Sequence, residues 1–108
     1  NESKPCISVI INCYNGEEFV DSALSTVLAQ TFTDWQLIFW DNQSIDDTRL
    51  LVQKYQDPRI HYYLAPTHTS LGEARNLAMK YADTEFVCLM VVFITIEQPK
   101  LIRNIRGK

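Results

Sequence analysis

The first group of residues that could carry chemistry stands at the end of an apolar, β-branched run. Asn12, Tyr14 and Asn15 follow directly after residues 6–11. A tyrosine ring at the carboxyl end of a strand can stack on a nucleobase, and asparagine amides can bond base edges or ribose. A turn that carries an exposed tyrosine fits the same residues equally well, so both interpretations stay open.

A second group, residues 41–44, follows the apolar run of residues 35–40. The carboxylate of Asp41 could accept hydrogen bonds from a base N–H or from ribose hydroxyls, as acids do after the second strand of dinucleotide-binding folds. Asn42 beside it can also hydrogen-bond. The alternative is a strand-end turn with a helix cap, and Ser44 is interpreted as structural on that ground.

The third group is residues 72–76, where Arg75 is a candidate for binding a diphosphate or for pairing with Asp41. Arginine suits phosphate because its guanidinium forms two parallel hydrogen bonds. A solvated arginine on a helix is the competing interpretation. His61 and His68 stand alone in the sequence, and both are interpreted as structural, in a strand and in a loop.

Composition excludes several classes of protein. The chain has 108 residues, of which 46% are hydrophobic, and a formal net charge of -3. These values fit one ordinary domain with a real core and give no electrostatic case for a nucleic-acid partner, although a nucleotide bound by local groups is not excluded. No GxGxxG, Walker or GxSxG motif is present, which removes the standard dinucleotide, P-loop and hydrolase interpretations.

Three cysteines, at positions 6, 13 and 88, lack the spacing of a disulfide framework or a zinc site. Cys6 and Cys88 lie in apolar runs and are predicted to be buried. We expect a reducing, cytoplasmic location, either free or peripheral at a membrane. The sequence begins with no leader-like apolar segment, and its longest apolar run, residues 86–96, is shorter than the ~20 residues of a membrane span.

Apolar runs alternate with helical patterns along the chain, which predicts an α/β fold with a mainly parallel sheet and helices on both faces. Expected strands are residues 6–11, 35–40, 59–64 and 86–94, the third of them at an edge. The expected helices begin at the acids Glu17–Glu18, at Ser44 and at Gly72. The second has Ser44 as its N-cap, Asp47 at the capping-box position, and residues 50, 51, 52 and 55 as its apolar face. The basic tail, residues 97–108, is predicted to start a short helix.

Four segments together resemble the family 2 glycosyltransferases. These are ISVIINCYN at 7–15, similar to VSVIIPTYN; AQTF at 29–32, similar to the QT segment; DNQSIDDT at 41–48, similar to DDGSTDDT; and GEARN at 72–76 with EFV at 85–87, similar to GxxxARNxxxxxAxGEYI. Their order and spacing match as well, over about residues 5–90. Each motif alone is a weak signal, and four in sequence are a strong one.

The resemblance implies the GT-A fold, with a Rossmann-like half of strand order 3-2-1-4. It implies transfer of a sugar from a nucleotide diphosphate donor, expected to be a UDP-sugar, to an acceptor hydroxyl of a saccharide or glycoconjugate in cell-envelope polysaccharide synthesis. Tyr14 is then expected near the base, Asn12 and Asn15 in the pocket wall, and Asp41 or Asn42 reading the base. Arg75 would support the acidic pair or the phosphates.

One departure concerns the metal. The family's fourth strand ends in an acidic motif that holds Mg²⁺ or Mn²⁺, whereas residues 91–95 here are Val-Val-Phe-Ile-Thr, and Glu97 comes too late to replace it. Apolar side chains cannot ligate a hard cation. No metal ligand is therefore predicted, and the catalytic base is not identified.

We expect residues 1–108 to be a single, truncated domain, the nucleotide-binding part of such an enzyme, that binds nucleotide weakly and does not turn over. A truncated sheet would also favour self-association. The alternative is a natural short relative that acts as a non-catalytic nucleotide-binding or interaction module. A flavodoxin-like signalling domain is disfavoured, because the first strand ends in Asn-Cys-Tyr-Asn without an acidic cluster.

Overall fold

The computed structural model describes residues 5–93. Its elements are β1 (Ile7–Tyr14), α1 (Val20–Leu28), β2 (Trp35–Asp41), α2 (Thr48–Gln53), β3 (Ile60–Leu64), α3 (Leu71–Met79) and β4 (Phe86–Phe93). The fourth strand was predicted to end at residue 94, which lies outside the described residues. The helix predicted in residues 97–108 lies outside them as well.

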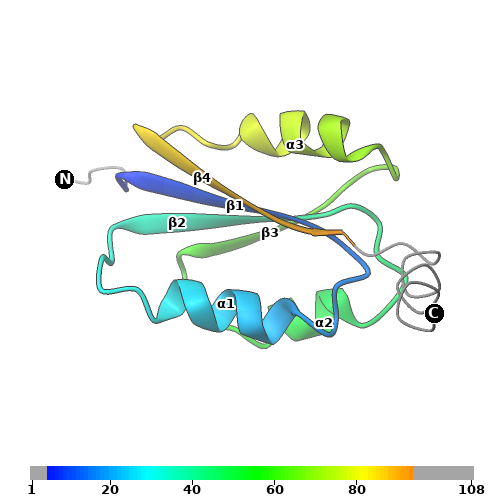
Figure 1. Ribbon diagram of the computed structural model, residues 1–108, viewed down its shortest axis with the longest axis horizontal. Coiled ribbons are helices and arrows are strands. Elements are labelled where there is room, and N and C mark those ends of the chain that lie inside the picture. The colour runs from blue at the N-terminus through cyan, green and yellow to red at the C-terminus, as the bar shows by residue number, and fades with distance from the viewer. Residues whose placement is uncertain (1–4, 94–108) are drawn as a thin grey trace, which may run out of the picture.

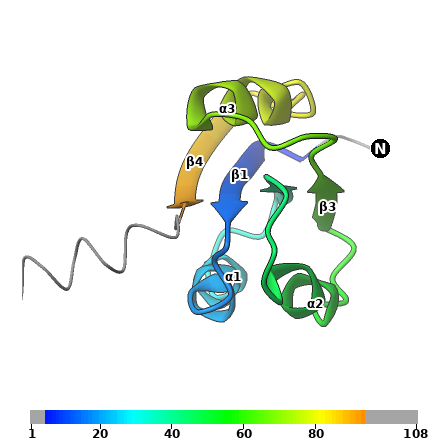
Figure 2. The same ribbon diagram turned by 90° about the vertical axis from the view of Figure 1, so that its right-hand side faces the viewer.

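The four strands form one parallel sheet in the order β3-β2-β1-β4. Helices α1 and α2 cover one face and α3 covers the other, as Figures 1 and 2 show. The predicted α/β class, the strand order and the edge position of the third strand are therefore confirmed. Every parallel connection crosses over through a helix, as parallel pairing requires.

Strand β1 lies between two hydrophobic cores, one on each face of the sheet. Its alternate side chains Ile11 and Cys13 pack into the core beneath α1 and α2, together with Leu37 and Phe39 of β2. Ile10 faces the other way, into a smaller core beneath α3. Burial on both faces accounts for the unbroken apolar sequence of this strand, and it confirms the prediction made from that sequence.

Helix α1 starts later than the acidic pair suggested. It begins at Val20, so Glu17 and Glu18 lie in the preceding turn. The Glu17 backbone N–H donates to the Asp46 carboxylate at 3.2 Å, and the Glu17 carboxylate accepts from the Asp47 N–H at 2.8 Å. Glu17 is thus hydrogen-bonded to a loop about 30 positions further along the chain. A local helix pattern in the sequence could not reveal this contact.

Helix α2 also starts later than predicted, at Thr48, and Ser44 is not its N-cap. The Ser44 hydroxyl accepts instead from the backbone N–H of Asn15 at 2.9 Å. The structural role expected for Ser44 stands, but it joins two loops rather than capping a helix. Leu50 was wrongly placed on the apolar face of this helix, since it is 60% exposed.

The prediction that Cys6 and Cys88 are buried is wrong for Cys88, which is exposed, and Cys6 is half-buried. Cys88 lies in β4, which forms one edge of the sheet. Phe86, Val87 and Leu89 of this strand are exposed as well. An apolar sequence run indicates a strand, but which faces of that strand are covered depends on its place in the sheet.

Candidate functional site

The candidate residues come from the carboxyl ends of β1 and β2 and from the middle of α3, where Arg75 lies. Figure 2 looks onto the edge of the sheet where β1 ends. In the strand order 3-2-1-4, the direction in which the chain adds strands reverses between β1 and β4. Ligands of open α/β sheets bind in the crevice at such a reversal, beyond the carboxyl ends of the strands. The position of the polar groups in the fold is therefore that of a ligand site.

The loops after β1 and β2 are tied together by hydrogen bonds. The Asn42 N–H donates to the Cys13 carbonyl at 2.8 Å, and the Ile45 N–H donates to Asn15 Oδ1 at 2.9 Å. Asn15 adopts a left-handed backbone with φ 56°, which asparagine tolerates better than most residues. Asn15 therefore shapes the rim of the site, and its contact with a ligand stays a prediction.

Asp41 is fully buried, and both of its carboxylate oxygens have partners within the chain. The Ser44 N–H donates to Oδ1 at 2.8 Å, and the Tyr62 hydroxyl donates to Oδ2 at 2.5 Å. Burial and this contact with Asp41 raise the pKa of the Tyr62 phenol. The Asp41 carboxylate thus links β2 to β3 through Tyr62. It also lies at the end of β2, where an acid that recognises the base was predicted.

Asn42 uses both ends of its buried amide to bind the loop before α3. Its Nδ2 donates to the Thr69 carbonyl at 2.7 Å, and its Oδ1 accepts from the Thr69 N–H at 3.0 Å. A carboxylate has no hydrogen to donate to a carbonyl. The hydrogen bond to the Thr69 carbonyl therefore explains structurally why this chain has asparagine where the family often has a second acid.

Tyr14 lies against His68, the isolated histidine that was interpreted from the sequence as a structural loop residue. Its ring is 4.5 Å from the ring of His68, with the planes tilted by 59°. Nδ1 of His68 lies 3.0 Å from the Asn42 carbonyl oxygen. Tyr14, His68 and Asn42 thus come together from three segments of the chain, and no spacing pattern in the sequence links them.

Three buried polar groups face the α3 side of the sheet without partners among residues 5–93. They are both amide atoms of Asn12, Nε1 of Trp40 and Nε of Arg75. Asn12 and Trp40 are register partners on β1 and β2. Arg75 forms no ion pair with Asp41, whose partners are Ser44 and Tyr62. Unsatisfied buried groups are costly, so Asn12 and Arg75 keep unused hydrogen-bonding capacity, and their contact with a ligand stays a prediction.

Cys13 is the next-to-last residue of β1, and its side chain packs in the core on the α1 and α2 face of the sheet. Burial, with a smaller contribution from the nearby Asp41 charge, raises its pKa from 9.0 to about 12. A thiol with that pKa is almost entirely protonated at neutral pH and is a poor nucleophile. Cys13 is therefore a packing residue of the site.

The residues at the end of β4 do not fit a divalent cation. Val91 is the register partner of Asn12, and Phe93 that of Tyr14, so the residue types at these positions of the sequence carry no side-chain oxygen. Within residues 5–93, no group of three or more His, Cys, Asp or Glu residues could hold a metal ion. Mg²⁺ and Mn²⁺ need oxygen ligands.

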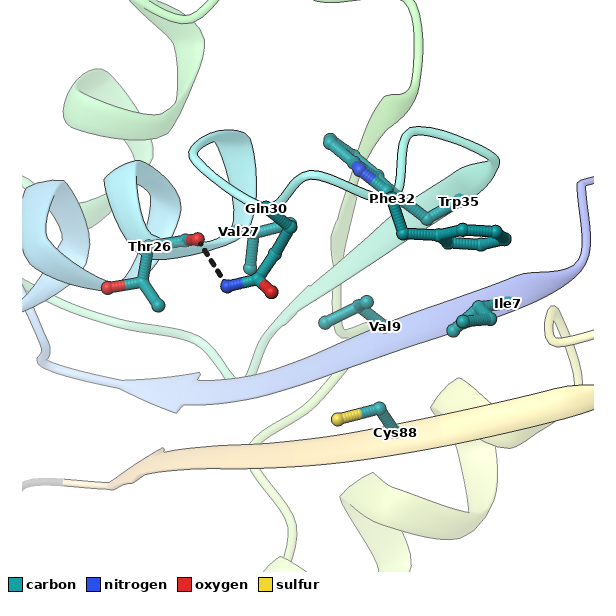
Figure 3. A pocket seen from close by; sticks show the side chains of 8 residues that line it. All are labelled: Ile7, Val9, Thr26, Val27, Gln30, Phe32, Trp35 and Cys88. Carbon is teal, nitrogen blue, oxygen red and sulfur yellow. Dashed lines mark hydrogen bonds between the residues drawn. The ribbon is translucent and has the colours of Figure 1, made fainter.

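An apolar groove of about 340 Å³ lies apart from this edge, between α1 and the first residues of β1 and β2. Figure 3 shows Ile7, Val9 and Cys88 pointing into it from neighbouring strands, with Phe32 and Trp35 at one end. A hydrogen bond of 3.0 Å from Gln30 Nε2 to the Thr26 carbonyl borders it. The groove offers few polar groups and borders the exposed strand β4.

Comparison with known proteins identifies the class. Residues 8–90 match the profile of glycosyl transferase family 2, and the chain belongs to this family. The match ends at Met90, one residue before the apolar sequence Val91-Val92-Phe93. No helix among the described residues is long and apolar enough to span a membrane.

Individual relatives agree with this assignment. The chain is 34% identical over 84 residues to the UDP-Glc:alpha-D-GlcNAc-diphosphoundecaprenol beta-1,3-glucosyltransferase WfgD of Escherichia coli, covering 78% of this chain and 33% of WfgD. It is similar to the structure of Staphylococcus aureus TarS 1–349 in complex with UDP-GlcNAc, with a TM-score of 0.76 and 27% identity over 94% of this chain and 31% of that one.

A structure of the mannosyltransferase PcManGT from Pyrobaculum calidifontis, in complex with GDP-Man and Mn²⁺, has a TM-score of 0.74 at 18% identity. It covers 89% of this chain and 30% of that one. At this identity the likeness supports the fold, which is the GT-A type of α/β sheet. The chain spans about a third or less of the length of the relatives it matches.

Proposed function

We propose that this chain is the nucleotide-binding part of a glycosyltransferase that takes a hexosyl group from a UDP-sugar. The observation that carries the proposal is a pair of buried groups without partners among residues 5–93, the amide of Asn12 on β1 and Nε of Arg75 on α3. An amide suits ribose or a base edge, and a guanidinium suits a diphosphate. Membership of family 2 supports the same ligand class.

We further propose that the acceptor is a hydroxyl of a saccharide or lipid-linked glycoconjugate in envelope polysaccharide synthesis. The relative WfgD, named for a diphosphoundecaprenol-linked acceptor, supports this part. A cytoplasmic location, peripheral at the membrane, would bring the enzyme to such an acceptor. The inverting stereochemistry of the transfer is expected from the family alone.

The experiment is a titration of the 108-residue chain with UDP, UDP-glucose, UDP-N-acetylglucosamine and GDP-mannose, followed by ¹⁵N chemical shifts. We expect weak, millimolar-range binding of the uridine nucleotides, which Mn²⁺ does not strengthen. Replacing Arg75→Met should weaken UDP binding about tenfold or more, because it removes a charged hydrogen bond. Uridine, which has no phosphate, should be affected much less.

A second candidate function is supported by the apolar end of β4. Without an oxygen ligand there, the charge on a leaving nucleoside diphosphate has no metal to stabilise it, which favours a non-catalytic nucleotide-binding or interaction module. Release of UDP from a UDP-sugar by this chain, dependent on Mn²⁺, would exclude that alternative. The absence of any nucleotide binding at millimolar concentration would contradict both forms of the proposal.

A further inference from the structure

His68 is an exposed side chain that is nevertheless held in one orientation. It lies in the loop between β3 and α3, and its Nδ1 is 3.0 Å from the Asn42 carbonyl oxygen. Its ring also lies 4.5 Å from that of Tyr14. Asn42 is itself buried and fixed by Thr69, so the support beneath the imidazole is rigid.

The contact with Asn42 defines the chemistry of the other ring nitrogen. A carbonyl oxygen can only accept, so Nδ1 must carry the hydrogen. In the neutral imidazole Nε2 is then an acceptor. Nε2 makes no hydrogen bond to any of residues 5–93. The loop thus holds an unused acceptor next to an aromatic ring at the carboxyl edge of the sheet.

The two residues expected to read a base have little left to offer. Both oxygens of Asp41 are partnered, and the residue is fully buried. Both ends of the Asn42 amide are bound to Thr69. A uracil base attached to ribose carries one hydrogen-bond donor on its edge, the N3–H, and a site that recognises uracil must present an acceptor to it.

We propose that His68 is the base-recognition residue of this site. Its Nε2 accepts a hydrogen bond from the N3–H of uracil while the base lies against the ring of Tyr14. The inference rests on the proposed function, the binding of a uridine nucleotide at this edge. It assigns the choice of base to the loop before α3, whereas the sequence motifs pointed to the end of β2.

The test compares UDP with N3-methyl-UDP, which lacks the donor, on the wild-type chain and on His68→Phe. Phenylalanine keeps a ring against Tyr14 and loses both nitrogens. His61→Phe is the matched control, because His61 is the other exposed histidine and lies within β3. Titrations followed by ¹⁵N–¹H spectra give the dissociation constants and report in the same spectra that each variant is folded.

We expect the wild type and His61→Phe to bind UDP about three- to tenfold more tightly than N3-methyl-UDP, the ratio that one neutral hydrogen bond supplies. His68→Phe should bind the two nucleotides equally, with the loss confined to UDP. Equal binding by the wild type would overturn the inference, as would an unchanged preference in folded His68→Phe. In either case measurable binding of UDP leaves the proposed function standing, while no binding of UDP to the wild type overturns both.

Discussion

At the scale of single residues, the three cysteines differ in burial: Cys13 is buried, Cys6 is half-buried and Cys88 is exposed. Cys13 is buried and its pKa is raised to about 12, whereas Cys88 is exposed. At the same pH, the thiolate fraction of Cys13 is about a thousandfold below that of a thiol with the ordinary value of 9.0. We expect a maleimide to label Cys88 quickly at pH 7.5 and to leave Cys13 unmodified.

Peptide mass spectrometry after timed labelling measures this difference. Labelling in 6 M urea is the control, because all three thiols should then react at similar rates. Rapid modification of Cys13 in the folded chain, at a rate close to that of Cys88, would contradict the burial of the β1 carboxyl end.

Two groups, the Cys13 thiol and the Tyr62 phenol, make the stability of the fold depend on pH in the alkaline range. Burial raises the pKa of the Cys13 thiol and the Tyr62 phenol above their usual 9.0 and 10.0, and Asp41 adds to both shifts. The folded state therefore holds protons that the unfolded state releases. The stabilisation is complete below pH 9 and declines as pH rises, first through Cys13 and above pH 10 through Tyr62 as well.

Urea unfolding at intervals between pH 8 and pH 11 measures this decline as a falling midpoint. Cys13→Ala should remove the part that begins near pH 9, so its midpoint should fall only above pH 10. A midpoint that stays constant over the whole range for the wild type would mean that neither group is buried as described.

At the scale of elements, the amide of Asn42 joins the end of β2 to the loop that leads into α3. Asn42→Asp restores the second acid of the family motif, but places a carboxylate oxygen 2.7 Å from the Thr69 carbonyl. Two acceptors then face each other in a buried place. We expect a loss of about 1–3 kcal/mol in the free energy of unfolding.

Asn76→Asp is the control, because Asn76 is exposed on α3 and the change of charge is the same. Chemical unfolding at pH 7 compares the two variants. If Asn42→Asp were as stable as Asn76→Asp, the Asn42–Thr69 hydrogen bonds would not contribute as inferred.

The strands were predictable because their signal is local, whereas their order was predicted from the resemblance to the GT-A fold. Unbroken apolar runs such as that of β1 identify strands buried on both faces, and alternation with helical patterns leads to a parallel sheet. The starts of α1 and α2 were not predictable. Glu17 and Ser44 carry the composition of helix starts, yet both are bound to the facing loop about 30 positions away, and no local pattern contains that contact.

The candidate site was predictable in part. The resemblance located Asn12, Tyr14, Asp41 and Arg75 near one edge of the sheet, since motifs report the ends of strands. It could not reveal that Asp41 is paired with Tyr62 across two strands, nor that His68 packs on Tyr14. Both contacts join residues more than 20 positions apart, and they depend on how the loops close over the sheet.

At the scale of the whole molecule, β4 is an edge strand that combines length with apolar character. It has eight residues, and Phe86, Val87 and Leu89 are exposed. Natural edge strands usually carry charges or bulges that prevent pairing with another chain. The apolar groove beside Cys88 enlarges the hydrophobic surface. We therefore expect the 108-residue chain to self-associate through β4 as its concentration rises.

Sedimentation velocity between 5 and 500 μM tests this expectation through a sedimentation coefficient that increases with concentration. Leu89→Lys should keep the chain monomeric, because a lysine on an edge strand opposes pairing. Leu50→Lys is the control: Leu50 is even more exposed, at 60% against 45% for Leu89, but lies on α2. Association that survives Leu89→Lys and disappears in Leu50→Lys would place the contact on the helical face, and a monomeric wild type at 500 μM would show that exposed β4 does not drive pairing.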